Sequence, residues 1–181
     1  MTQPNIEALV DYWQARRNGE AAPARASIDP MDFVQILPQV IMLGRRGPGD
    51  YVFRLVGGFV ADLHGLDLRG VDFTALWAQN ARQPIRNALE DARRDPAAIH
   101  ITADVQAGEL TLPVSLVLLP LTNAEGVVDR FIGLCQPTAP VNRLRGQTAD
   151  RLSLVTLDHQ GAEAFSEPRI RLVAVAGERV R

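Results

Sequence analysis

The sequence contains no lysine, and its arginines do not form basic clusters. All 19 basic residues are arginine, against 21 acidic residues, which gives a formal net charge of −2. No basic run is longer than a pair, such as Arg16-Arg17 or Arg45-Arg46. A nucleic-acid binder normally carries a basic patch or stripe that neutralises phosphates. We therefore expect no nucleic-acid partner.

Cysteine and long apolar runs are also scarce. A single cysteine, Cys135, excludes an intrachain disulfide and a multi-cysteine metal site, and it fits a reducing compartment. The longest apolar stretch, Val114 to Leu121, is far shorter than the roughly 20 residues that a membrane span needs. Glu7 and Asp11 stand where a secretory signal would carry positive charge and then an apolar run. The expectation is a cytoplasmic protein without a membrane span.

The length and composition fit one folded domain with an extension. The chain has 181 residues, of which 46% are hydrophobic and 22% charged, values close to those of ordinary globular proteins. The patterns below divide it into an N-terminal helix and linker (1–27), a core (28–137) and a C-terminal extension (138–181).

The N-terminal region predicts an amphipathic helix that ends at Asn18-Gly19. Its apolar residues follow i, i+3, i+4, i+7 spacing: Ile6, Leu9, Val10 and Trp13. Two interpretations stay open. The stripe forms a homodimer interface, or it covers the outer face of a sheet in its own chain.

The core alternates short helical and extended patterns. Asp29 caps a short helix that begins at Pro30 and stops at Pro38. Pro84 either kinks the helical region 74–94 or begins a second segment there. A helix at 59–64 and five extended segments complete the core, the latter at 40–43, 51–56, 98–106, 110–121 and 127–136.

This order predicts an α+β domain with a five-stranded antiparallel sheet. The helices between the second and third strands must cover one face, and the last three strands form an antiparallel meander. Leu116 to Leu119 is apolar at four successive positions, so both faces of that strand are expected to be buried. The apolar runs Leu152–Leu157 and Ile170–Val175 either add an edge hairpin or become ordered on a partner.

An ordered series of motifs resembles the single-domain PAS proteins of alphaproteobacteria. The matching stretches are Tyr12-Trp13 with Arg17-Asn18-Gly19, Ile28-Asp29-Pro30 with Ile36-Leu37-Pro38, Asp50-Tyr51-Val52-Phe53-Arg54-Leu55-Val56-Gly57, Leu63-His64-Gly65 with Leu68-Arg69-Gly70, and Leu119-Pro120-Leu121 with Asp129-Arg130-Phe131-Ile132-Gly133. Gly58 departs from the pattern, since such proteins often have threonine there. The resemblance implies a PAS fold and a signalling or regulatory role. It does not imply a cofactor, because PAS domains bind haem, flavin, small metabolites or nothing.

Residues that could carry chemistry are few and scattered. His64 or His100 could ligate haem or act as a general base, and Cys135 could form a flavin adduct. The alternatives are a helix-end histidine and a small buried thiol. The three histidines lack metal-ligand spacing, and Ser115 and Ser153 lack the motif of a nucleophile. We expect no enzyme, no metal and no catalytic residues.

The predicted pocket lies between the helices and the sheet. It comprises Leu55, Leu63, His64, Trp77, His100 and Cys135. The leading hypothesis is a sensory protein that contacts an unidentified signalling partner and is gated by a small apolar ligand. The alternative is a ligand-free adaptor. A polar set is interpreted either as a signal relay across the sheet or as caps and ion pairs: Asp29, Tyr51, Arg54, Asp129 and Arg130.

Overall fold

The computed structural model describes residues 3–161, which build one antiparallel sheet with helices on both faces. The strand order is β2-β1-β5-β4-β3-β6, and every neighbouring pair is antiparallel. The strands are β1 (Val40–Gly47), β2 (Asp50–Val56), β3 (Ala97–Ala107), β4 (Leu110–Thr122), β5 (Val128–Pro137) and β6 (Arg151–Gly161). The α+β sheet and the meander of the last three core strands are therefore confirmed.

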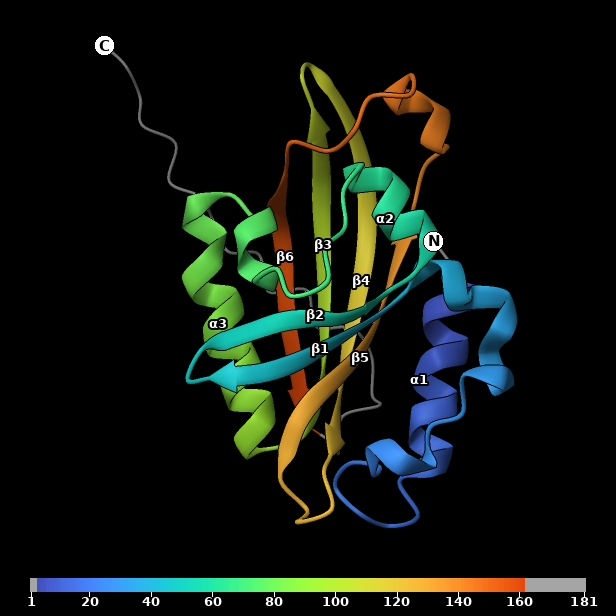
Figure 1. Ribbon diagram of the computed structural model, residues 1–181, viewed down its shortest axis with the longest axis vertical. Coiled ribbons are helices and arrows are strands. Elements are labelled where there is room, and N and C mark those ends of the chain that lie inside the picture. Colours follow the sequence, from blue (N-terminus) through green and yellow to red (C-terminus); the bar gives the residue numbers. More distant parts are fainter. Residues whose placement is uncertain (1–2, 162–181) are drawn as a thin grey trace.

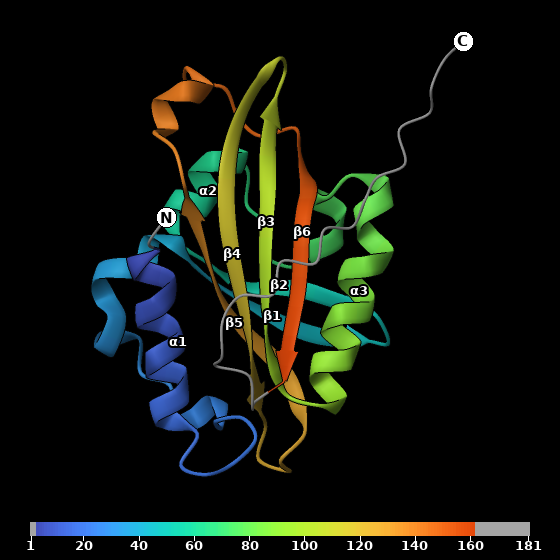
Figure 2. The same cartoon turned by 180° about the vertical axis from the view of Figure 1, so that it is seen from behind.

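The helices lie on opposite sides of the sheet. Figures 1 and 2 show α3 (Gln79–Arg94) and α1 (Pro4–Arg16) on opposite flanks. The second α-helix, α2 (Gly58–His64), follows β2. In the part of the chain that the structure describes, four 3₁₀ helices connect the other elements: η1 (Arg25–Ser27), η2 (Pro30–Gln39), η3 (Phe73–Leu76) and η4 (Val141–Leu144). Within residues 3–161, no helix is both long and apolar enough to cross a bilayer.

Two hydrophobic cores occupy the two faces of the sheet. The inner core lies under α2, η3 and α3, and the outer core lies under α1 and η2. Strand β4 divides its side chains between them: Leu116 and Leu118 belong to the inner core, while Val117 and Leu119 belong to the outer core. Burial of both faces of this strand is confirmed.

Helix α1 covers the outer face of its own sheet. All four residues of its apolar stripe are at most 5% exposed and belong to the outer core: Ile6, Leu9, Val10 and Trp13. The indole Nε1 of Trp13 donates to the carbonyl oxygen of Pro120 at 2.8 Å. The helix ends at Arg16, and Asn18 and Gly19 follow with positive φ, where glycine carries no steric penalty. A homodimer that exchanges this helix stays a prediction.

A sixth strand joins the sheet at the edge beside β3. The expected run Leu152–Leu157 forms part of β6, whose register with β3 pairs Val105 with Leu152 and Ile101 with Leu157. It is a single edge strand where we had expected five strands in all. The other run, Ile170–Val175, lies outside the described residues.

The helical region 74–94 is interrupted at a different place from the one expected. Helix α3 continues through Pro84, and the break falls at Trp77-Ala78, where Ala78 has an extended ψ of 147°. There the backbone N–H of Ala78 donates to the carbonyl oxygen of Leu152 in β6 at 2.8 Å. A partner more than 70 residues away sets the interruption, so local sequence could not reveal it.

Helix η2 is a 3₁₀ helix with its cap in the expected place. The Asp29 carboxylate accepts from the backbone N–H of Met31 at 2.9 Å, and Pro30 occupies the first helical position. The helix runs through Pro38 to Gln39, one residue further than predicted. Its kink at Phe33 turns that ring into the outer core.

Candidate functional site

Four of the six predicted pocket residues lie on the helical side or at its margin. Leu63, Trp77 and Cys135 belong to the inner core, and His64 follows Leu63 at the end of α2 with 6% exposure. Burial lowers the pKa of His64 to about 4 and raises the pKa of Cys135 to about 12. At neutral pH both side chains are uncharged.

Aromatic side chains fill the inner core around Trp77. The rings of Phe53 and Phe73 meet edge to face at 5.6 Å, and those of Phe73 and Trp77 at 5.8 Å. All three residues are 1% exposed. The Trp77 Nε1 atom is buried and has no hydrogen-bond partner among the described residues. Three buried rings therefore pack against one another in the region where we had expected a ligand.

Leu55 and His100 lie on the opposite face, so the six residues do not line one cavity. Met42 pairs with Leu55 but Leu43 pairs with Phe53, which leaves Arg54 as an extra residue in a β-bulge. Simple alternation would place Leu55 on the same side as Phe53, and the bulge moves it to the outer face. His100 alternates with Ile99 and Ile101 of the inner core, and burial lowers its pKa.

The outer face carries an apolar groove beside η2. Its volume is about 390 Å³, within the usual range for ligand sites. Most of its lining comes from η1, η2, β1, β2 and β5, and two arginines contribute to it. The groove is lined by Arg25, Ala26, Ile28, Pro30, Phe33, Leu37, Val40, Met42, Arg54, Leu55 and Ile132. We call this the outer groove.

Helix η2, which supplies part of the groove's lining, also carries exposed apolar side chains. Met31 is 71% exposed and Val34 is 50% exposed, and both belong to the helix that supplies Phe33 and Leu37 to the groove. Leu55, on the opposite wall, is 37% exposed. Single exposed apolar residues are ordinary, but an apolar groove whose lining helix also exposes apolar side chains is typical of binding surfaces.

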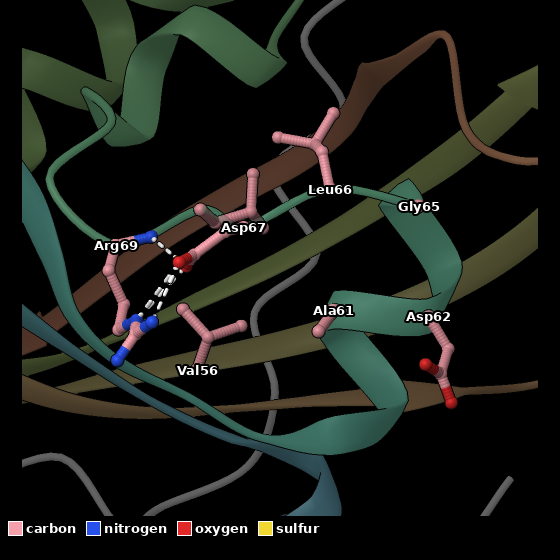
Figure 3. A pocket seen from close by; sticks show the side chains of 8 residues that line it. Val56, Ala61, Asp62, Gly65, Leu66, Asp67 and Arg69 are labelled. Atoms are coloured by element: carbon pink, nitrogen blue, oxygen red, sulfur yellow. Dashed lines mark hydrogen bonds and ion pairs between the residues drawn. The ribbon is translucent and has the colours of Figure 1, made fainter.

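Two other depressions are more polar. The one beside α2 is lined by Asp62, Leu66, Asp67 and Arg69 among others, and Figure 3 shows Arg69 bonded to the carboxylate of Asp67. Its arginine is therefore neutralised locally. Within residues 3–161, no group of three metal-ligating side chains gathers at any point.

The third depression contains a carboxylate that the sequence analysis missed. Glu90 Oε1 on α3 accepts from Tyr51 Oη at 2.8 Å, Arg45 Nε at 3.0 Å and Gly49 N at 3.1 Å. Burial opposes its ionisation, but these hydrogen bonds outweigh burial and hold the pKa of Glu90 at about 2. The network ties the β1–β2 hairpin to α3. The only sequence signal was the position of Glu90 four residues after Arg86 on the polar side of the helix.

The polar set of the sequence analysis therefore does not meet at one point. Asp29 caps η2, Tyr51 donates a hydrogen bond to Glu90, and Arg130 Nη1 lies 3.8 Å from Asp129 Oδ2. Arg54 lines the outer groove. The Asp29 cap and the Asp129–Arg130 ion pair agree with the interpretation of caps and ion pairs, whereas Arg54 forms no ion pair within residues 3–161.

Comparison with known proteins identifies a family. The family model described as "PAS domain" matches residues 1–136. The crystal structure of the Rhodobacter sphaeroides LOV protein aligns with a TM-score of 0.46 and 14% identity over 63% of this chain and 70% of that chain. The structure of an RNA-binding Light-Oxygen-Voltage receptor aligns with a TM-score of 0.48 and 16% identity over 65% of this chain and 35% of that chain. No curated protein matches in sequence.

Proposed function

This chain belongs to the PAS domain family, which implies a sensory or regulatory role, and we propose that it exerts this role by docking a partner protein on the outer groove. The observation that carries the proposal is the contrast between the two faces. Aromatic rings fill the inner core, whereas an apolar groove with exposed Met31, Val34 and Leu55 opens on the outer face. Exposed apolar surface of this kind is costly in water unless a partner covers it.

The packed interior supports the ligand-free form of this proposal over gating by a small ligand. Phe53, Phe73 and Trp77 already contact one another where a guest would have to enter. Native mass spectrometry of the protein purified from its own host tests this point. We expect the mass of the polypeptide or a whole multiple of it. A haem, flavin or metabolite that is retained stoichiometrically would overturn the ligand-free form.

Site-specific photo-cross-linking tests the docking surface itself. A photoreactive residue at Val34 samples the exposed side of η2, the helix that supplies Phe33 and Leu37 to the outer groove, and one at Val155 on β6 is a matched control. The two valines are similarly exposed, at 50% and 58%. We expect a protein cross-linked from position 34 and not from position 155, which mass spectrometry would identify.

The identified protein is then purified and titrated against three forms of the full chain. Val34→Glu places a charge against an apolar contact and is expected to weaken binding about tenfold or more, whereas Val155→Glu leaves it unchanged. Equal cross-linking from both positions, or equal affinity of both variants, would refute docking at the outer groove.

A further inference from the structure

The outer groove combines an apolar floor with uncompensated positive charge. Arg25 and Arg54 line it, and neither forms an ion pair with another residue in the range 3–161. The other two depressions differ in this respect. Arg69 pairs with Asp67 at 2.7 Å, and Arg86 pairs with Asp72 at 3.3 Å. Of these three depressions, the outer groove is therefore the one whose arginines are not paired with carboxylates.

A third guanidinium group, that of Arg130, lies beside the Arg54 side chain above Gly44. A Cβ atom at this position would lie 2.8 Å from Arg54 Nε and 2.9 Å from Arg130 Nη1, so both side chains cross the strand over the same glycine. The nearest carboxylate oxygen to Arg130 is Asp129 Oδ2 at 3.8 Å, a distance too long for a direct hydrogen bond. Like charges repel one another, and a carboxylate bound between the two guanidinium groups would relieve that repulsion.

We propose that the outer groove receives a segment of a partner protein in which apolar side chains are flanked by carboxylates. This inference rests on the proposed function and adds the chemistry of the partner. An apolar side chain inserts among Phe33, Leu37 and Ile132, and a carboxylate takes the planar donors of Arg54. Met31 and Val34 are exposed on η2, the helix that supplies Phe33 and Leu37 to the groove, which suits a polypeptide that covers several side chains.

Two synthetic peptides serve as probes of this chemistry. One is an amphipathic helix with leucine along one face and glutamate along both flanks, and the other replaces every glutamate with lysine. Binding to the full chain is measured by fluorescence anisotropy at two salt concentrations. We expect the glutamate peptide to bind, with lower affinity at high salt, and the lysine peptide not to bind.

Charge-reversal variants locate the contact. Arg25→Glu and Arg54→Glu are each expected to weaken the glutamate peptide about tenfold and to admit the lysine peptide. Arg143→Glu is the matched control, because Arg143 is an exposed arginine on η4 outside the groove, and its affinity is expected to equal that of the wild type.

The outcomes separate this inference from the function on which it rests. Equal binding of both peptides, or a glutamate peptide insensitive to Arg54→Glu, would overturn the acidic partner. A protein cross-linked from Val34 that still binds Arg54→Glu with full affinity would leave docking intact and overturn only the charge assignment. If the chain binds phosphatidylglycerol vesicles but not the glutamate peptide, and Arg54→Glu abolishes the vesicle binding, the occupant is not a polypeptide and the inference is overturned.

Discussion

The two tryptophans provide a controlled test of how the two cores are built. Each is 1% exposed, and each lies in one of the two cores, Trp13 in the outer and Trp77 in the inner. Trp13 Nε1 donates to the Pro120 carbonyl at 2.8 Å, whereas Trp77 Nε1 is buried without a partner among the described residues. Replacing each by phenylalanine removes a similar apolar volume but has opposite consequences for hydrogen bonding.

The difference between the two variants has a definite sign and size. Trp13→Phe loses a buried hydrogen bond, which contributes about 1 kcal/mol to stability. Trp77→Phe removes a donor whose desolvation is not repaid, which restores about 1 kcal/mol or more. Trp13→Phe should therefore be less stable than Trp77→Phe by about 2 kcal/mol. For a domain of this size, that difference corresponds to a melting temperature lower by roughly 4–8 °C.

Urea unfolding followed by far-ultraviolet circular dichroism measures both free energies without depending on indole fluorescence. Phenylalanine at position 13 still offers a ring face to Arg17, whose guanidinium lies 5.3 Å from the Trp13 ring, so that contact changes little. Two variants destabilised to the same extent would refute the reasoning. In that case Trp77 Nε1 has a partner, such as a bound ligand or a buried water molecule.

Three further predictions concern single side chains. Glu90→Gln should lower the free energy of unfolding by about 2 kcal/mol at pH 7. Because the pKa of Glu90 in the folded protein is lowered to about 2, the difference between the variant and the wild type should disappear as the pH falls from about 4.5 towards 2. Urea unfolding at each pH measures it. Gly57→Ala should lower the free energy of unfolding by about 3 kcal/mol, because the added Cβ atom would collide with the backbone carbonyls of Leu37 and Pro38. At the neighbouring Gly58 an added Cβ atom meets no atom within 4 Å, so Gly58→Ala should leave stability unchanged or raise it slightly. Thermal unfolding measures both variants. Cys135, whose pKa burial raises to about 12, should resist iodoacetamide in the native protein at pH 8 and react readily in urea; prompt native labelling would contradict its burial.

Patterns that depend on near neighbours in sequence were readable in advance. The stripe from Ile6 to Trp13, the Asp29 cap and the doubly apolar stretch of β4 each report a local period or a local hydrogen bond. The short loops between the last three strands allowed only antiparallel pairing. These features predicted the fold class, the β1–β2 hairpin and the meander of β3, β4 and β5, but not the pairing of β1 with β5 that joins them.

Features that depend on distant neighbours were not readable. The bulge at Arg54 is defined by its pairing with β1, so alternation alone placed Leu55 on the wrong face. The partner of Glu90 is a hairpin some 40 residues away, and the interruption at Ala78 is set by Leu152. The predicted pocket consequently mixed residues of two faces, and the outer groove was not foreseen.

Strand β6 contacts both the sheet and the helical side, so the folded unit extends beyond the family-matched segment. This strand completes the backbone pairing of β3, supplies Leu152 to the inner core and anchors the residue before α3. A fragment cut after residue 137 would contain the whole family-matched segment yet expose a long unpaired strand edge and a gap in its interior, both of which promote aggregation. We therefore expect the family-matched segment to be less stable by itself than the same segment followed by β6.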